Sequence, residues 1–346
     1  MGAPRTPGEG YARCSTADSA LIANRSDRRR HALLWRWGLA LVGCALVFYG
    51  IAGYLCTASQ IGENPRWRGM NRGPQDFGLT GDVVSLHSTD GISLKGWWLP
   101  SQGPARANVI IAHGVDHTRQ VMLPRASFLV RGGYNVLAID LRGHGESTAQ
   151  YASPGYLESR DVLGAIQYVH ERGEHDPIVL LGLSYGAAAV VLAAAQSEDV
   201  AAVIADGVYP SGADVFENIN RGIASSSGMN PALRVVAFIA RCPGIPTAAA
   251  LVYYARTGIW LGPDLVNVVS YAARIGVPIL FISGTRDWIV PTDQVRRVMA
   301  AVPSPLKSLI TIPDAQHDTT FSTAPALYQG AVLKFLDSSL PKQREH

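Results

Sequence analysis

The stretch IVLLGLSYGAAAVVLAA, residues 178–194, decides the fold of this chain. An apolar run typical of a buried strand leads into Gly182-Leu183-Ser184-Tyr185-Gly186, and an apolar run typical of a buried helix follows. A G-x-S-x-G pattern in this context indicates a sharp turn that holds the serine in a strained conformation, with glycines leaving room for it. Ser184 is therefore a candidate nucleophile, and the alternative is a serine that only caps the helix.

Strand-like and helix-like segments alternate on both sides of this motif. The predicted strands are residues 83–87, 93–99, 108–112, 135–140, 178–182, 201–205, 278–283 and 308–312. The predicted helices are residues 119–131, 159–172, 185–196, 293–301 and 324–338. This alternation predicts an α/β fold with a mostly parallel, eight-stranded sheet covered on both faces. Asp90-Gly91 between the first two strands predicts an antiparallel hairpin.

Two further polar residues follow predicted strands at the edge where ligands of such sheets bind. Asp287 comes just after the strand 278–283, and His317 lies in the loop after the strand 308–312. A serine nucleophile needs a base to remove its proton and an acidic group to hold that base. We therefore expect Ser184, His317 and Asp287 to form a catalytic triad.

Other residues compete for these roles. Asp314 and Asp318 flank the histidine and are rival acids. His113 and His144 are the other candidate bases, but they do not follow the chain order serine, acid, histidine. His113 is more simply explained as a polar residue that braces its loop.

A nucleophilic serine also needs two donors for the oxyanion that forms during the reaction. The backbone N–H of Tyr185 follows the nucleophile directly. The loop after the strand 108–112 supplies the second, and Val115 is the expected donor because Gly114 lets the backbone turn toward the site.

The N-terminal part of the chain has a different character. Residues 1–32 show no hydrophobic periodicity and are expected to be a disordered basic tail. Residues 37–62 carry no charge. This uncharged stretch is longer than the ~20 residues that a helix needs to cross a bilayer. We predict a transmembrane helix at about residues 34–55, within a segment 33–58, and a connector over residues 59–81.

Charge indicates the orientation of this helix. Residues 1–72 carry ten Arg and four acidic residues, which leaves 20 basic and 23 acidic residues for the remainder. The positive-inside rule then places the N-terminus in the cytoplasm and the large domain outside, with the helix as an uncleaved signal-anchor. The alternative is a cleaved signal peptide and a secreted protein.

Composition excludes several other classes of protein. Hydrophobic residues make up 47% of the chain, which is too many for a disordered protein. The net charge of +3 belongs to the N-terminal part, so the large domain lacks the basic face that nucleic-acid binding requires. The four cysteines, Cys14, Cys44, Cys56 and Cys242, have no spacing that would suggest zinc, and we expect no metal site.

These motifs resemble an α/β-hydrolase. The matching segments are His113-Gly114, the loop of residues 140–147 (DLRGHGES), the serine motif, residues 284–287 (GTRD) and residues 316–318 (QHD). The resemblance covers about residues 80–340, with the hydrolase domain expected at residues 82–340, and is nearest to membrane-anchored or secreted serine hydrolases of the Bem46-like and serine-aminopeptidase-like branches. It implies that the loop 140–147 is structural and that an inserted cap occupies about residues 207–274.

This resemblance implies a serine hydrolase that forms an acyl-enzyme and needs no cofactor. We expect a small-molecule or lipid-like carboxylic ester as substrate, with a thioester as an alternative. A peptidase or aminopeptidase and an acyltransferase would use the same triad, and a membrane-anchored binding protein without catalysis is a minor alternative. The cap, with apolar stretches at residues 233–239 and 248–254, is expected to cover the site and to set the choice of substrate.

Overall fold

A computed structural model describes residues 15–57, 69–149 and 151–341. The chain divides into two compact units, residues 1–51 and residues 52–346, and each is described by itself. The larger unit contains the whole sheet and every residue predicted for the site.

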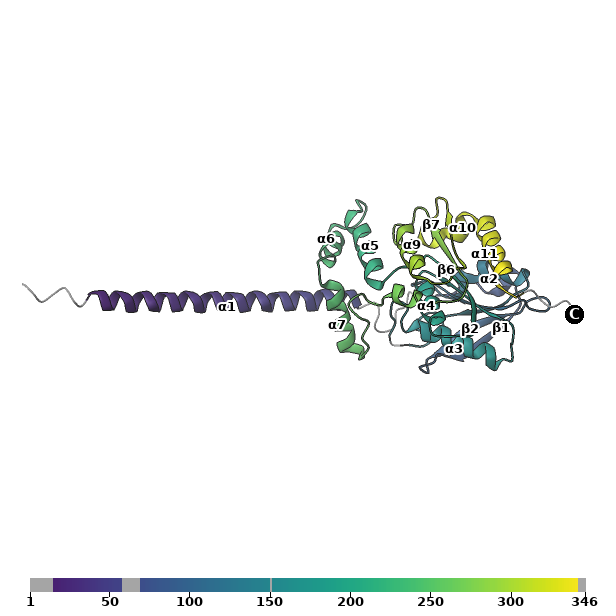
Figure 1. Ribbon diagram of the computed structural model, residues 1–346, viewed down its shortest axis with the longest axis horizontal. Helices are drawn as coiled ribbons and strands as arrows, with labels where there is room; N and C mark the ends of the chain where they lie inside the picture. The colour runs from purple at the N-terminus through teal and green to yellow at the C-terminus, as the bar shows by residue number, and fades with distance from the viewer. Residues whose placement is uncertain (1–14, 58–68, 150, 342–346) are drawn as a thin grey trace, which may run out of the picture. The chain divides into compact units, whose positions relative to one another are not determined.

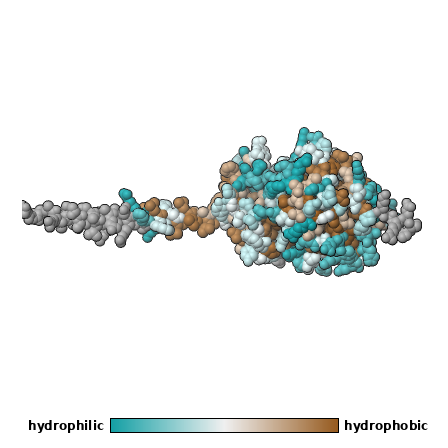
Figure 2. Space-filling view, viewed as in Figure 1, coloured by the Kyte–Doolittle hydropathy of each residue, from teal (hydrophilic) through white to brown (hydrophobic). Residues whose placement is uncertain are grey.

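The first unit consists of most of one long helix, α1 (Ser15–Thr57). Its segment Leu33–Leu55 is long and apolar enough to cross a membrane and is almost entirely exposed. Figure 2 shows side chains of the described part of α1 changing from hydrophilic to hydrophobic along the helix. The prediction of a candidate membrane span is thus confirmed.

The prediction of a disordered tail over residues 1–32 is wrong for residues 15–32, which belong to α1. Ala, Leu and Arg are good helix formers, and the helix extends backward from the apolar segment because each added residue gains a hydrogen bond. Residues 1–14 of the predicted tail and residues 58–68 of the predicted connector lie outside the described residues.

The second unit is built on an eight-stranded sheet with the strand order β1-β2-β4-β3-β5-β6-β7-β8 (Figure 1). The strands are β1 (Asp82–His87), β2 (Ser93–Leu99), β3 (Asn108–Ala112), β4 (Asn135–Ile139), β5 (Ile178–Leu183), β6 (Val200–Asp206), β7 (Ile279–Gly284) and β8 (Lys307–Ile312). All eight predicted strands are confirmed to within one residue at either end. The antiparallel hairpin of β1 and β2 is confirmed too, and β2 also pairs antiparallel with β4.

Helices cover both faces of the sheet, as the apolar runs of its strands require. One face packs against α3 (Glu158–Glu171), α4 (Tyr185–Ala194), α8 (Val268–Ala272) and α9 (Thr292–Ala301). The other packs against α2 (Leu123–Arg131) and α11 (Pro325–Ser339). Short helical turns are η3 (Pro74–Phe77), η4 (Arg119–Met122), η5 (His317–Thr319) and α10 (Thr320–Thr323). Every predicted helix is present.

A helical cap lies between β6 and β7. It contains α5 (Gly212–Ser225), α6 (Pro231–Ala240), α7 (Ile245–Thr257) and the short α8. The two apolar stretches expected in the cap fall within α6 and α7, which are bent by 88° relative to each other. A cap at this point lies above the carboxyl ends of the parallel strands, where the site is expected.

The loop of residues 140–147 is held by buried charge. Arg142 is only 3% exposed, and its guanidinium donates to Asp161 Oδ1 of α3 at 2.7 Å and to Asp90 Oδ1 at 2.7 Å. Ser147 Oγ donates to the carbonyl of Asp140 at 2.7 Å. These contacts tie the loop to α3 and to the β1–β2 turn, which agrees with a structural role.

We predict that Arg142→Met destabilises the protein by about 3–5 kcal/mol, because the Asp161 carboxylate is left buried without its cation. Adding Asp161→Leu should recover most of this loss, since both charges are then removed. Denaturant unfolding in detergent measures both effects.

Arg106→Met is the matched control. Arg106 pairs with Asp337, whose side chain is 58% exposed, so this change should cost no more than about 1 kcal/mol. A loss in Arg142→Met no larger than that of the control would contradict the structural role of the loop.

Candidate active site

Ser184 lies at the sharp turn between β5 and α4. Its backbone has φ 52° and ψ −109°, a conformation that non-glycine residues rarely adopt and that is strained. Its N–H donates to the carbonyl of Asp206 at the end of β6, 2.7 Å away. The turn thus presents the serine at the carboxyl edge of the sheet.

Two glycines make the turn sterically feasible. A Cβ at Gly182 would collide with the carbonyl of Gly186, and a Cβ at Gly186 would collide with the carbonyl of Ala112 on β3. Because the backbones approach so closely, neither position accepts a side chain without a local shift. The structure therefore gives the G-x-S-x-G spacing a direct steric explanation.

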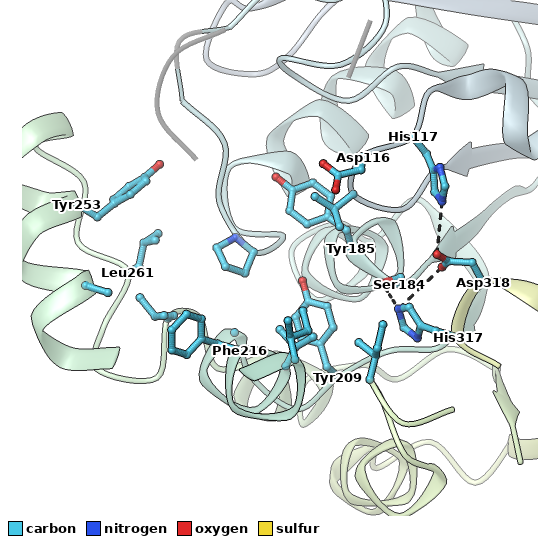
Figure 3. Close-up of a pocket in the computed structure, with 18 residues that line it drawn as sticks. Asp116, His117, Ser184, Tyr185, Tyr209, Phe216, Tyr253, Leu261, His317 and Asp318 are labelled. Carbon is cyan, nitrogen blue, oxygen red and sulfur yellow. Dashed lines mark hydrogen bonds and ion pairs between the residues drawn. The ribbon is translucent and has the colours of Figure 1, made fainter. Parts of the chain in front are cut away.

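The structure brings the three predicted catalytic side chains together (Figure 3 shows Ser184 and His317). Ser184 Oγ lies 2.7 Å from His317 Nε2, and His317 Nδ1 lies 2.7 Å from Asp287 Oδ2. The other oxygen of Asp287 accepts hydrogen bonds from the N–H groups of Ile289 and Val290. All three side chains are buried, so the pairs are shielded from water.

The electrostatics of His317 suit a base. Burial works to lower the pKa of His317, but the hydrogen bond and the charge of Asp287 outweigh it, and the pKa lies above its ordinary value. Asp287 thus stabilises the protonated imidazole that would form when the serine gives up its proton.

The rival acids lie elsewhere. Asp314 pairs with Arg286 on the surface, where both side chains are largely exposed. Asp318 Oδ1 is 3.9 Å from His317 Nε2, the nitrogen that faces the serine, and its Oδ2 is 3.4 Å from His117. Only Asp287, of these three carboxylates, bonds the far nitrogen of the imidazole.

The rival bases have structural contacts. The backbone N–H of Leu141 donates to Nε2 of His113. Because Nε2 of this ring accepts, Nδ1 of His113 carries the proton and donates to the carbonyl of Gly114 at 2.7 Å. Burial holds the pKa of His113 well below its usual range. His144 bonds the carbonyl of Arg142, and burial lowers the pKa of His144 to about 4. His113 thus braces the loop that carries Val115.

The two predicted oxyanion donors border the same cavity as Ser184. Tyr185 is the first residue of α4, so its N–H has no partner four residues earlier in the helix. The loop of Val115 approaches the nucleophile, because a Cβ on Gly114 would lie 3.7 Å from the Cβ of Ser184. Both residues thus border the space beside the serine.

The cavity at the serine has a volume of ≈ 380 Å³ and two chemically different sides. Asp116, His117 and Asp318 lie beside the serine and His317, and Phe216, Leu261 and Tyr253 lie farther along the cavity (Figure 3). The first side is polar, and the second is lined by cap residues that are mostly apolar. A bound molecule would therefore place its apolar part under the cap.

Sequence reasoning missed the residues that support this geometry. Asp206 Oδ2 accepts from Arg125 at 2.9 Å and from Thr320, which lies three residues after His317, at 2.7 Å. Since the carbonyl of Asp206 also accepts from Ser184, one residue connects the nucleophile turn with the histidine segment. The position of Asp206 at a strand end was an available signal, whereas a single Arg on a helix is ordinarily exposed.

Within the described residues, no group of three or more His, Cys, Asp and Glu side chains is arranged to hold a metal ion.

Comparisons with known proteins agree with this architecture. The uncharacterized protein YfhR of Escherichia coli (strain K12) is 28% identical over 272 residues, which cover 76% of this chain and 82% of that protein. Protein bem46 of Schizosaccharomyces pombe is 23% identical over 253 residues, covering 71% of this chain and 74% of bem46.

Solved structures show the same fold. The Pyrococcus furiosus esterase Pf2001 superposes with a TM-score of 0.64 at 23% identity, covering 81% of this chain and 100% of that one. A family model described as the alpha/beta hydrolase family matches residues 109–329, from β3 into α11. Because that match spans more than half of the sequence, the chain belongs to the alpha/beta hydrolase family.

Proposed function

We propose that this protein is a serine hydrolase that cleaves a carboxylic ester. Membership of the alpha/beta hydrolase family supports a hydrolase, and solved esterases share its fold. One observation carries the finer assignment: two contacts of 2.7 Å connect Ser184 to His317 and His317 to Asp287.

The geometry supports the following sequence of steps. Ser184 Oγ attacks the ester carbonyl while its proton passes to His317 Nε2. The tetrahedral intermediate collapses, the bond to the leaving oxygen breaks, and His317 gives its proton to that oxygen. A water molecule then attacks the acyl-enzyme, with His317 again accepting and returning a proton, which releases the acid and restores Ser184.

The negative oxygen of each intermediate needs donors. We assign this role to the N–H groups of Val115 and Tyr185, which border the cavity beside the nucleophile. Tyr185 starts α4, and the partial positive charge of a helix N-terminus adds to the stabilisation. Donors held by the backbone need no rearrangement as the charge develops.

The cavity supports an ester with an apolar acyl group. Phe216, Leu261 and Tyr253 offer contacts to hydrocarbon, while polar atoms gather at the catalytic residues. A thioester, a peptide bond or an acceptor other than water would use the same three residues, and substrate panels distinguish these reactions.

We also propose the division of the chain. Residues 33–58 anchor the protein in a membrane, residues 82–340 form the hydrolase domain, and residues 207–274 form its cap. The helix Leu33–Leu55 supports the anchor. The Arg-rich residues before it favour a cytoplasmic N-terminus and a domain on the outer side.

A fluorophosphonate probe should label the folded full chain in detergent, and Ser184→Ala should abolish the labelling. The same change should lower ester hydrolysis on the order of 10⁴–10⁶-fold, because no other group supplies the nucleophile. Gel fluorescence and p-nitrophenyl ester assays measure the two effects. In a matched panel, aminoacyl-naphthylamides should remain uncleaved.

Ser338→Ala is the control, since Ser338 is exposed on α11, outside the residues that line the cavity. This variant should label like the wild type. Absence of labelling in the folded wild type, or equal labelling of Ser184→Ala, would refute the assignment of the nucleophile.

The loss of activity at low pH depends on protonation of His317. The imidazole must be neutral to accept the serine proton, and its pKa is raised by Asp287. Activity should therefore be lost as the pH falls through a value above ~6.5, the ordinary pKa of histidine. Asp287→Asn should shift the midpoint of kcat/KM to lower pH and reduce the rate by about 10⁴-fold.

Asp314→Asn is the matched control, because this exposed carboxylate does not bond the imidazole. Its profile should coincide with that of the wild type. A midpoint that stays in place in Asp287→Asn would show that another group orients His317.

The proposed orientation predicts the result of protease protection. Protease added to intact cells or spheroplasts should degrade the domain of residues 82–340, while a tag at the N-terminus should survive until the membrane is permeabilised. If the domain survives while the protease digests a control protein on the outer face, the domain lies on the cytoplasmic side and the proposed orientation is wrong.

A further inference from the structure

The cap helix α6 exposes most of its large apolar side chains. Four of its apolar side chains are between 51% and 66% exposed: Leu233, Val235, Val236 and Phe238. Its buried residues are Ala237 and Ala240. A surface helix of a soluble domain ordinarily turns its large apolar side chains toward the core. Val235 and Phe238 share the face of α6 opposite the two buried alanines, and this outward face therefore has the composition of a contact surface.

The exposed apolar surface continues beyond α6. Leu251 and Tyr254 of α7 and the following Trp260 are each about half exposed. The rings of Tyr254 and Trp260 meet edge to face, with centroids 6.2 Å apart. Tyr and Trp are the residues enriched where a protein meets the interface of a bilayer. We call these residues, together with the four on α6, the outer cap surface.

The charge of this part of the chain is one-sided. Residues 218–263 contain Arg221, Arg234, Arg241 and Arg256 and no acidic residue. Glu217, just before this range, pairs with Arg221 at 3.2 Å and with Arg241 at 2.8 Å, so this part of the chain has one carboxylate for four guanidinium groups. An apolar surface bordered by arginine suits a bilayer with anionic headgroups. A second copy of the same face is disfavoured, because a symmetric contact would bring the two sets of arginines together.

The chain itself keeps the cap near a membrane. The candidate span ends at Leu55, and η3 begins at Pro74. Even a fully extended chain over those positions reaches no more than about 70 Å at 3.3–3.6 Å per residue. A tether of this kind raises the effective concentration of the bilayer at the cap, so a modest apolar surface is sufficient for contact.

The inner side of α7 faces the cavity. Ala249 and Tyr253 of α7 line it, as does Leu261 next to Trp260. Along α7, residues that border the cavity thus alternate with Leu251 and Tyr254, which are exposed. A bilayer on the outer cap surface would be separated from the cavity by one layer of helix.

We propose that the outer cap surface lies on the anionic face of the lipid bilayer that α1 anchors. Val235 and Phe238, which share the face of α6 opposite the buried alanines, insert among the acyl chains near the headgroups, and the arginines lie at headgroup level. The cavity then opens beside the bilayer, where an ester with a long acyl chain can pass into it. This last step rests on the proposed function, whereas the contact with lipid does not.

The test uses the full chain in nanodiscs of phosphatidylcholine and phosphatidylglycerol at 3:1. An environment-sensitive NBD label is attached at Phe238→Cys, with Cys14, Cys44, Cys56 and Cys242 replaced by Ala. The matched control is Leu306→Cys, because Leu306 is 59% exposed and lies beside β8, outside the cap. NBD fluorescence is recorded with and without doxyl-labelled lipids.

We expect quenching at position 238 to exceed that at position 306 at least threefold, with a blue-shifted emission. Equal quenching at the two positions would overturn the proposal. A blue shift without quenching by lipid, which grows with protein concentration, would also overturn it and would indicate a second copy on this surface.

A second variant separates this proposal from the proposed function. Val235→Glu with Phe238→Glu should slow hydrolysis of a long-chain ester in nanodiscs at least tenfold and leave hydrolysis of p-nitrophenyl acetate unchanged. Equal hydrolysis of the long-chain ester by variant and wild type would contradict the route from the bilayer. If the wild type hydrolyses neither ester, the proposed function fails, while the quenching result still decides the lipid contact.

Discussion

The chain can turn from β5 into α4 at Ser184 only because no side chain stands at Gly182 or Gly186. The close approach of these backbones lets α4 begin directly beneath the serine, and the strain at φ 52° is held by a rigid surrounding of buried strands. A nucleophile on this turn cannot relax into the ordinary backbone conformation without displacing the helix. The other parts of the site are arranged around this fixed point.

Buried charge then fixes the partners of the serine. Asp206 is fully buried, accepts from the Ser184 N–H through its carbonyl, and binds Arg125 and Thr320 through its carboxylate. A buried carboxylate is costly without such partners, so the histidine segment and α2 are held to β6. The distance between nucleophile and imidazole thus depends on a residue that takes no part in the proposed chemistry.

Much of the fold could be predicted because its strands are apolar runs bounded by turn residues, and Asp287 and His317 directly follow two of them. The pairing of β2 with β4, the helical state of residues 15–32 and the role of Arg125 could not be predicted. Each of these depends on tertiary contacts or on helix propagation, and an isolated arginine in a helical pattern looks like a solvent-exposed residue.

In the cap, sequence periodicity does not predict which helices are buried and which are exposed. Residues 233–239 are apolar except for Arg234, so their pattern fits a buried helix and a helix with an exposed apolar face equally well. The structure shows that α6 is not a buried core helix, because it buries Ala237 and Ala240 and leaves Phe238 exposed. A helix that packs on a core would bury Phe238 and expose the alanines, since a buried Phe stabilises far more than a buried Ala. The exposed arrangement supports the proposed contact of the cap with lipid, since a chain anchored through the candidate span Leu33–Leu55 would have a bilayer within reach.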